Sequence, residues 1–102
     1  MTADCYRMYV VEAGNGMPER PALVRVGDGE GVGIACEMWR MRRGEFGDFV
    51  AKIPGPLGMG KVVLEGGEVH CGFIAEAIAM VGARDVSEWG GWRGYVAGQG
   101  VI

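Results

Sequence analysis

One segment has the spacing of an anion-binding loop: residues 55–61, with the sequence G-P-L-G-M-G-K. It satisfies the pattern G-x-x-x-x-G-K of the loop that holds phosphate groups in nucleotide hydrolases. That loop needs a Ser or Thr next, to hold magnesium, and then a helix whose N-terminus faces the phosphates. Here Val62 follows and begins a predicted strand, which argues against nucleotide hydrolysis. Backbone N–H groups beside Lys61 predict either a site for a small carboxylate or a plain structural turn.

His70 is the only histidine in the sequence and the only obvious general acid or base. In a strand it alternates with Val69 and Cys71, so it points to the opposite face from both. No Ser or Cys with an acid can be assigned beside it, so a surface or packed strand histidine is the favoured interpretation and catalysis the alternative. A lone histidine supplies too few ligands for a metal, and we predict neither a metal site nor a cofactor.

Two glutamates, Glu37 and Glu76, lie inside apolar runs that we interpret as strands. Burial of a carboxylate is costly unless it is paired. We therefore expect a partner among the arginines, and this Glu–Arg network is either structural, the favoured interpretation, or lines a pocket. The candidate partners are Arg7, Arg25, Arg84 and Arg93.

Three aromatic residues near the C-terminus, Trp89, Trp92 and Tyr95, are spaced three apart. Such a stripe usually belongs to a core or an interface, and ligand stacking is less common. We predict a core role for all three. A short helical turn that starts at Asp85 is expected to stop at Gly90, because glycine disfavours helix.

The composition limits the class of protein. A length of 102 residues allows one domain, residues 1–102, with one core. The net charge of −3 argues against nucleic acid or a membrane surface as a partner. The N-terminus lacks the features of a signal peptide, and Cys5, Cys36 and Cys71 form no pairing motif. We expect a cytoplasmic protein with buried, inert thiols.

The elements that position these residues are mostly strands, separated by turns that the 20 glycines allow. Strands are predicted over residues 5–11, 22–26 and 32–41, the last as a central strand. A loop with two glycines and a proline follows the first strand.

A helix and a hairpin are predicted between residues 43 and 78. An apolar stripe predicts a short amphipathic helix that packs on the sheet and ends at Pro54. Residues 61–64 and 69–78 form a long hairpin in which Gly66 and Gly67 make a type I′ turn. The stripe consists of Phe46, Phe49, Val50 and Ile53.

Five segments resemble the C-terminal domain of allophanate hydrolase, the enzyme of bacterial and fungal urea degradation. They read Y-R-M-Y, C-E-M-W, I-P-G-P-L-G-M-G-K, G-F-I-A-E and R-D-V-S-E-W-G-G-W-R-G-Y, and begin at Tyr6, Cys36, Ile53, Gly72 and Arg84. The resemblance implies an α+β fold with a small mixed, mostly antiparallel, barrel-like sheet and one or two short helices, related to gamma-glutamylcyclotransferases. It also implies decarboxylation of N-carboxycarbamate, which the amidase domain of the hydrolase releases from allophanate.

Given this resemblance, we expect the glycine-rich segment, residues 55–61, to bind the N-carboxycarbamate dianion. It supplies N–H donors and a positive charge, and His70 is the candidate proton donor to nitrogen. Glu37, Glu76, Trp89, Trp92, Arg93 and Tyr95 are expected to be structural or to line the pocket. The expected substrate-binding residues are Leu57, Gly58, Met59, Gly60, Lys61 and Arg7.

The chain also departs from the family pattern. The serine and lysine of the amidase domain are absent, so the chain alone is not expected to hydrolyse allophanate. The family domain usually has an earlier strand and a glycine-rich loop with a histidine, and without them the expected site is incomplete. Gamma-glutamylcyclotransferase chemistry is less favoured, because residues 49–57 contain no carboxylate. The alternatives are a binding or assembly module that forms a homodimer or joins an amidase subunit, and a small-carboxylate binder without turnover.

Overall fold

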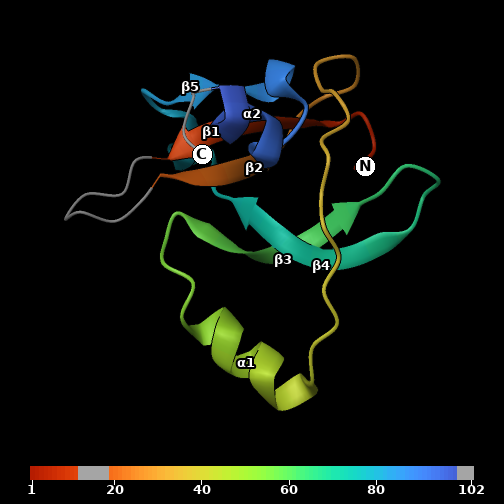
Figure 1. Ribbon diagram of the computed structural model, residues 1–102, viewed down its shortest axis with the longest axis vertical. Coiled ribbons are helices and arrows are strands. Elements are labelled where there is room, and N and C mark those ends of the chain that lie inside the picture. The colour runs from red at the N-terminus through yellow and green to blue at the C-terminus, as the bar shows by residue number, and fades with distance from the viewer. Residues whose placement is uncertain (12–18, 99–102) are drawn as a thin grey trace.

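A three-stranded antiparallel sheet in the order β2-β1-β5 forms one layer of the fold (Figure 1). The structure is a computed structural model and describes residues 1–11 and 19–98. Strand β1 (Tyr6–Val11) pairs with β2 (Arg20–Arg25) and with the short β5 (Arg84–Asp85). The first two predicted strands are thus confirmed, whereas the glycine and proline loop predicted between them lies outside the described residues.

A hairpin of β3 (Leu57–Val63) and β4 (Val69–Ala75) forms the second layer. The hairpin is confirmed, with positive φ angles of 93° and 94° at Gly66 and Gly67. Its turn is not the predicted two-residue type I′ turn. The Leu64 N–H donates to the Glu68 carbonyl at 2.8 Å, so this pair continues the ladder beyond the two strands and closes a turn of three residues, 65–67.

The core lies between the two layers. Alternate side chains of β1 are buried, as period-two strand geometry requires. Tyr6 is fully buried, and its hydroxyl oxygen accepts a hydrogen bond of 2.9 Å from the Val63 N–H of the hairpin. This contact ties the sheet to β3. The buried hydrophobic cluster is Tyr6, Met8, Val10, Ile34, Val62, Val86 and Tyr95.

The predicted central strand over residues 32–41 does not form. Val32 and Ala35 make only isolated bridges, to Tyr6 and to Gly91. Cys36 to Arg42 have no regular secondary structure, and their side chains are exposed. Apolar and β-branched residues form a strand only where a second strand satisfies their backbone groups, and within the described residues none runs beside this segment.

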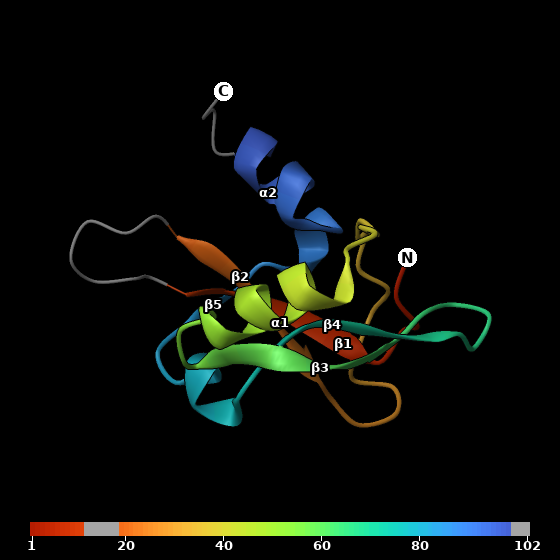
Figure 2. The same ribbon diagram turned by 90° about the horizontal axis from the view of Figure 1, so that it is seen from below.

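Helix α1 (Arg43–Ala51) confirms the predicted amphipathic helix, which ends before Pro54. The predicted packing on the sheet is limited to a contact with the hairpin, and no residue of α1 is fully buried. Its Phe49 ring meets the edge of Phe73 on β4, with centroids 5.3 Å apart. The helix lies on the side of the hairpin that faces away from the three-stranded sheet (Figures 1 and 2).

The C-terminal segment contains more helix than predicted. Two short 3-10 turns, η1 (Ala77–Met80) and η2 (Ser87–Trp89), flank β5, and Gly90 ends η2 with φ 78° as expected. Helix α2 (Trp92–Gly98) then follows. The predicted α+β class with two short α-helices is confirmed. None of the helices in the described residues has the length and apolarity that a membrane crossing requires.

Gly31→Ala is expected to lower the free energy of unfolding by about 2–3 kcal/mol. A Cβ at Gly31 would lie 2.5 Å from the Tyr6 backbone nitrogen, which cannot move without distorting β1. Gly47→Ala is the matched control, because a Cβ there meets open space and alanine stabilises a helix interior by about 0.5–1 kcal/mol. Urea unfolding measures both. Equal effects of the two substitutions would contradict this close approach.

Candidate functional site

The glycine-rich segment is part of β3 and not a loop. A strand and not a helix follows Gly55, which agrees with the argument against a nucleotide site. Two hydrogen bonds show which residue pairs of β3 and β4 are hydrogen-bonded. The Leu64 N–H donates to the Glu68 carbonyl, and the Glu76 N–H donates to the Pro56 carbonyl. Because antiparallel pairs alternate, the N–H groups of Met59 and Lys61 point away from β4. The segment therefore offers two backbone N–H groups on the edge of a strand. It does not form a loop that could surround an anion.

Lys61 and His70 lie on opposite faces of this hairpin. Lys61 pairs with Cys71 across the strands, and its Nζ lies 3.4 Å from Cys71 Sγ. His70 pairs with Val62, on the face toward the core, and its Nε2 lies 3.1 Å from a carboxylate oxygen of Glu68. The predicted direction of His70 is confirmed. The two residues do not converge on one small substrate.

The thiols are more exposed than the sequence predicts. Cys5 is half-buried, whereas Cys36 and Cys71 are exposed. Cys36 is exposed because the predicted strand around it does not form, and Cys71 because it lies on the outer face of β4. No group of histidine, cysteine or carboxylate side chains among the described residues could hold a metal ion.

Arg7 lies on β1 and forms a structural ion pair. Its Nε donates to Asp85 Oδ2 at 2.8 Å, and the Ser87 N–H donates to Asp85 Oδ1 at 2.9 Å. Burial raises the pKa of Asp85, but the hydrogen bonds from Arg7 and Ser87 together outweigh it and hold that pKa below its ordinary value. The guanidinium is thus engaged within its own sheet.

Asp85→Asn is expected to cost about 1 kcal/mol of stability near neutral pH, through loss of the charged hydrogen bond. Because the pKa of Asp85 is lower in the folded state than in the unfolded chain, its ionised carboxylate stabilises the fold at pH values above the unfolded-state pKa. This stabilisation is lost as the pH falls through the folded-state pKa. The difference between wild type and variant should therefore be constant above about pH 5 and shrink below about pH 4. Urea unfolding across this range measures it; a difference that grows on acidification would contradict the pairing.

The predicted glutamate network is only partly present, and it is not buried. Glu37 accepts a hydrogen bond from Arg93 Nε, which confirms one expected pairing. Both side chains are substantially exposed, because Glu37 lies in the irregular segment and not in a strand. Glu76 follows β4 and is also exposed.

The three aromatic residues of the tail differ in burial. Tyr95 is in the core and Trp92 is half-buried with its ring centroid 5.2 Å from that of Tyr95. The predicted core role is wrong for Trp89, which is 41% exposed and meets only the edge of the Tyr95 ring, with centroids 6.4 Å apart. Arg84 extends over the Tyr95 ring and donates to its hydroxyl oxygen.

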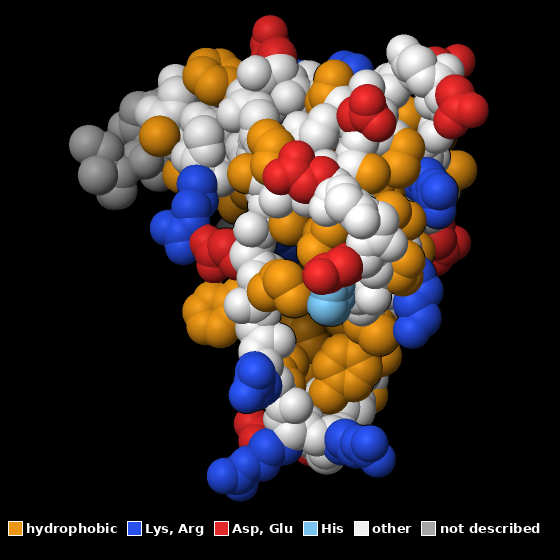
Figure 3. Space-filling model, turned by 90° about the vertical axis from the view of Figure 1, so that its right-hand side faces the viewer, with side chains coloured by type: hydrophobic (Ala, Val, Ile, Leu, Met, Phe, Trp, Pro, Cys, Tyr) orange, Lys and Arg blue, Asp and Glu red, His pale blue; other side chains and the backbone are white. Residues whose placement is uncertain are grey.

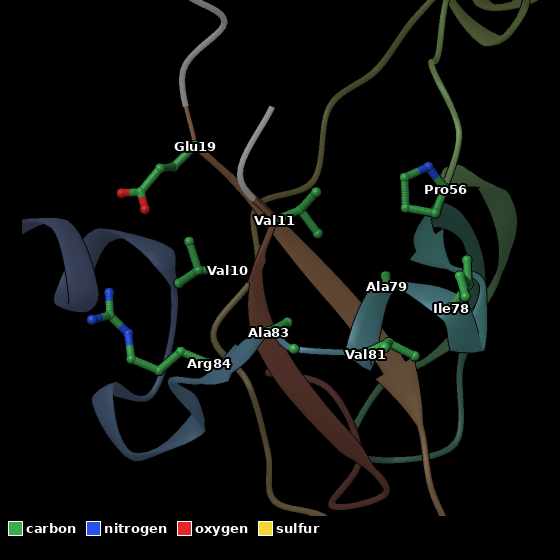
Figure 4. Close-up of a pocket in the computed structure, with 10 residues that line it drawn as sticks. Val10, Val11, Glu19, Pro56, Ile78, Ala79, Val81, Ala83 and Arg84 are labelled. Carbon is green, nitrogen blue, oxygen red and sulfur yellow. The ribbon is translucent and has the colours of Figure 1, made fainter. Parts of the chain in front are cut away.

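A cavity of about 420 Å³ opens between β1, η1 and β5. Most of its lining side chains are apolar, although Ile78 and Val81 are largely exposed to solvent, and Glu19 and Arg84 are its ionisable lining residues (Figure 4). Figure 4 shows these two on one side, with Pro56 and Ile78 on the other. The lining residues are Val10, Val11, Glu19, Pro56, Ile78, Ala79, Val81, Gly82, Ala83 and Arg84.

This cavity brings together segments that are far apart in the sequence. Val10 comes from β1, Pro56 from the start of the glycine-rich segment, and Arg84 from the start of the tail. The sequence suggested Arg84 only as a partner for a glutamate. The sequence did not predict that Arg84 lines a cavity. The one available signal was that Arg84 is the first residue of the distinctive segment R-D-V-S-E-W-G-G-W-R-G-Y.

Comparison with known proteins identifies the family. The sequence profile of the Allophanate hydrolase C-terminal domain matches residues 1–97. Urea amidolyase of Lachancea kluyveri is 34% identical over 97 residues, which are 93% of this chain and 5% of that protein. The structure of Kluyveromyces lactis allophanate hydrolase superposes with a TM-score of 0.87 at 35% identity, covering 96% of this chain and 16% of that one.

A smaller protein, the uropathogenic E. coli-specific protein c4763, has a similar structure. Its TM-score is 0.80 at 28% identity, over 94% of this chain and 71% of that chain. The present chain therefore spans only a small part of the curated relatives and most of this shorter one. On the match over residues 1–97, the chain belongs to the allophanate hydrolase C-terminal domain family.

Proposed function

We propose that this chain binds N-carboxycarbamate and accelerates its decarboxylation in the degradation of urea and allophanate. The observation that carries the proposal is the match of residues 1–97 to the C-terminal domain of allophanate hydrolase. In the reaction, one C–N bond breaks, carbon dioxide leaves, and the electron pair stays on nitrogen. The nitrogen takes a proton from solvent, and carbamate remains.

The cavity beside Arg84 suits this chemistry better than the hairpin does. A guanidinium can hold one carboxylate of the dianion through two parallel hydrogen bonds. Val10, which is buried, and Val11 line the same cavity and offer the second carboxylate no hydrogen bond. That carboxylate becomes neutral carbon dioxide, so a weakly solvating wall disfavours the ground state more than the transition state.

The set predicted from sequence, Leu57–Lys61 with Arg7 and His70, remains the competing location. Lys61 offers a cation and two edge amides lie nearby, but Arg7 is paired with Asp85. His70 lies near the turn of the hairpin, whereas Pro56 precedes its opposite end. A substrate in the cavity would therefore be out of reach of His70.

The test follows the decay of N-carboxycarbamate directly. An amidase that lacks a C-terminal domain generates the dianion from ¹³C-labelled allophanate, and carbon NMR records its loss with and without this chain. We expect the decay to accelerate in proportion to the concentration of folded chain, and heat-unfolded chain to have no effect. A decay rate equal to the spontaneous rate would refute the proposal. The chain alone should not consume allophanate.

A second candidate function is an assembly module. The observation that favours it is the exposed apolar surface around α1, a helix without a fully buried residue whose Phe49 contacts Phe73 of the hairpin. Such surfaces on small proteins mark interaction sites.

A further inference from the structure

Arg84 is the cation that lines the cavity, and solvent reaches this residue (Figure 4). Its backbone is fixed, because Arg84 pairs with Val10 where β5 joins β1. An arginine side chain that is free in solvent loses much of its conformational entropy when it binds a ligand. A residue that holds the guanidinium in place before the ligand arrives therefore strengthens binding.

Tyr95 of α2 makes two contacts with this guanidinium. Nη2 of Arg84 donates a hydrogen bond to the Tyr95 hydroxyl oxygen, and Cζ of Arg84 lies 5.4 Å from the centroid of the Tyr95 ring. Together these contacts restrict both the position and the tilt of the guanidinium plane. The bond to Tyr95 uses one hydrogen of Nη2, so one complete edge of two N–H groups remains for a carboxylate.

Tyr95 is itself fixed by its surroundings in the tail segment, residues 84–95. It is 3% exposed and belongs to the buried hydrophobic cluster. The Trp92 ring lies against it with centroids 5.2 Å apart, and the Trp89 ring meets its edge at 6.4 Å. The Tyr95 backbone N–H donates to the Gly91 carbonyl at 3.1 Å. The phenol is therefore a rigid support between the core and the cavity.

Arg84 is held by a neutral group, unlike the paired arginines of the chain. Arg7 and Arg93 are each bound to a carboxylate, that of Asp85 or of Glu37. Other cations are exposed at the end of the molecule that holds α1, where Figure 3 shows Lys and Arg side chains gathered. Within residues 1–11 and 19–98, Arg84 forms no ion pair with a carboxylate. Its positive charge is thus available to a ligand.

We propose that Tyr95 is a positioning residue of the cavity and that it holds Arg84 ready to bind a carboxylate. Because the phenol is neutral, it fixes the guanidinium without cancelling the charge that attracts the ligand. The inference rests on the proposed function, in which this carboxylate belongs to the N-carboxycarbamate dianion. It also gives the tail segment a second role, since Trp89 and Trp92 support Tyr95, and Tyr95 supports Arg84.

The first test measures the order of the Arg84 side chain without any ligand. The Nε–H group of Arg84 is followed by ¹⁵N relaxation NMR in the wild type and in Tyr95→Phe, which removes only the hydroxyl. We expect the heteronuclear NOE of this group to fall in Tyr95→Phe. Tyr6→Phe is the matched control, because Tyr6 is equally buried but does not line the cavity. It should leave the Arg84 signal unchanged. Equal order of Arg84 in the wild type and in Tyr95→Phe would overturn the proposal.

The second test measures the binding of malonate, a stable dianion with two carboxylates, by NMR titration. Tyr95→Phe should raise the malonate dissociation constant about threefold to tenfold, because Arg84 must then be ordered on binding. Tyr6→Phe should leave the constant unchanged, and an unchanged constant in Tyr95→Phe would also overturn the proposal. A wild type that does not bind malonate would contradict the proposed site itself, even where Tyr95→Phe loosens Arg84. Failure of the site and failure of the role of Tyr95 are therefore distinguishable.

Discussion

Arg84→Gln is expected to reduce the decay of N-carboxycarbamate to the rate measured without protein. The substitution removes the only cation that lines the described part of the cavity while keeping a side chain that can donate to the Tyr95 hydroxyl. Arg84 is exposed, and loss of a charge-assisted hydrogen bond from it weakens binding by about 1.5–3 kcal/mol, which corresponds to about a tenfold to hundredfold loss of rate at low substrate concentration. The carbon NMR assay measures it.

Two further variants serve as controls for the location of the site. Lys61→Ala and His70→Asn should retain the acceleration, because Lys61 lies on the outer hairpin face and His70 at the far end of the hairpin from Pro56. The opposite pattern, with activity lost in Lys61→Ala and kept in Arg84→Gln, would place the reaction at the glycine-rich strand. Arg84 also contacts the Tyr95 ring, so thermal unfolding must show that each variant is folded.

Tyr6→Ala is expected to have the largest effect on stability, a loss of about 3–5 kcal/mol. Tyr6 is fully buried at the centre of the hydrophobic cluster, and its hydroxyl joins the three-stranded sheet to the hairpin. A domain of this size is typically stable by only about 5–15 kcal/mol, so the variant should lose a large part of its stability. Urea unfolding monitored by circular dichroism measures the change.

Two milder substitutions separate the contributions of the ring and the hydroxyl. Tyr6→Phe keeps the ring but leaves the Val63 N–H without its acceptor, and should cost about 1 kcal/mol. Tyr9→Ala removes a ring from the same strand, but its side chain is only half-buried on the other face and should cost less than Tyr6→Ala. A similar loss for Tyr6→Ala and Tyr9→Ala would contradict the position of the core.

The strands and the helix α1 could be predicted because their patterns are local. The β-branched and aromatic composition of β1, the glycine pair in the hairpin and the apolar spacing of α1 each indicate the structure of a short segment. Residues 32–41 were predicted as a strand because their composition suits one, but a strand also needs a partner for its backbone. Helix α2 was missed because the glycines at Gly90 and Gly91 were expected to end the helical structure, whereas packing of Trp92 against Tyr95 supports a new helix after them.

The candidate site could be predicted only in part. The sequence identified Lys61 and His70 as groups able to do chemistry, but their assignment to opposite faces depends on the register of β3 against β4. Arg84 gains its position in the cavity from β1, η1 and the segment around Pro56, which meet only in three dimensions. The pairing of Arg7 with Asp85 is likewise a contact between residues far apart in sequence.

The central claim is that a small dianion binds in the cavity beside Arg84. Malonate, which replaces the nitrogen of N-carboxycarbamate by a methylene group and does not decay, is a stable probe for it. A titration of ¹⁵N-labelled chain with malonate should shift the amide resonances of Val10, Val11 and Arg84, and the shifts should be lost in Arg84→Gln. Shifts confined to Met59 and Lys61, or no saturable shift at all, would contradict the claim.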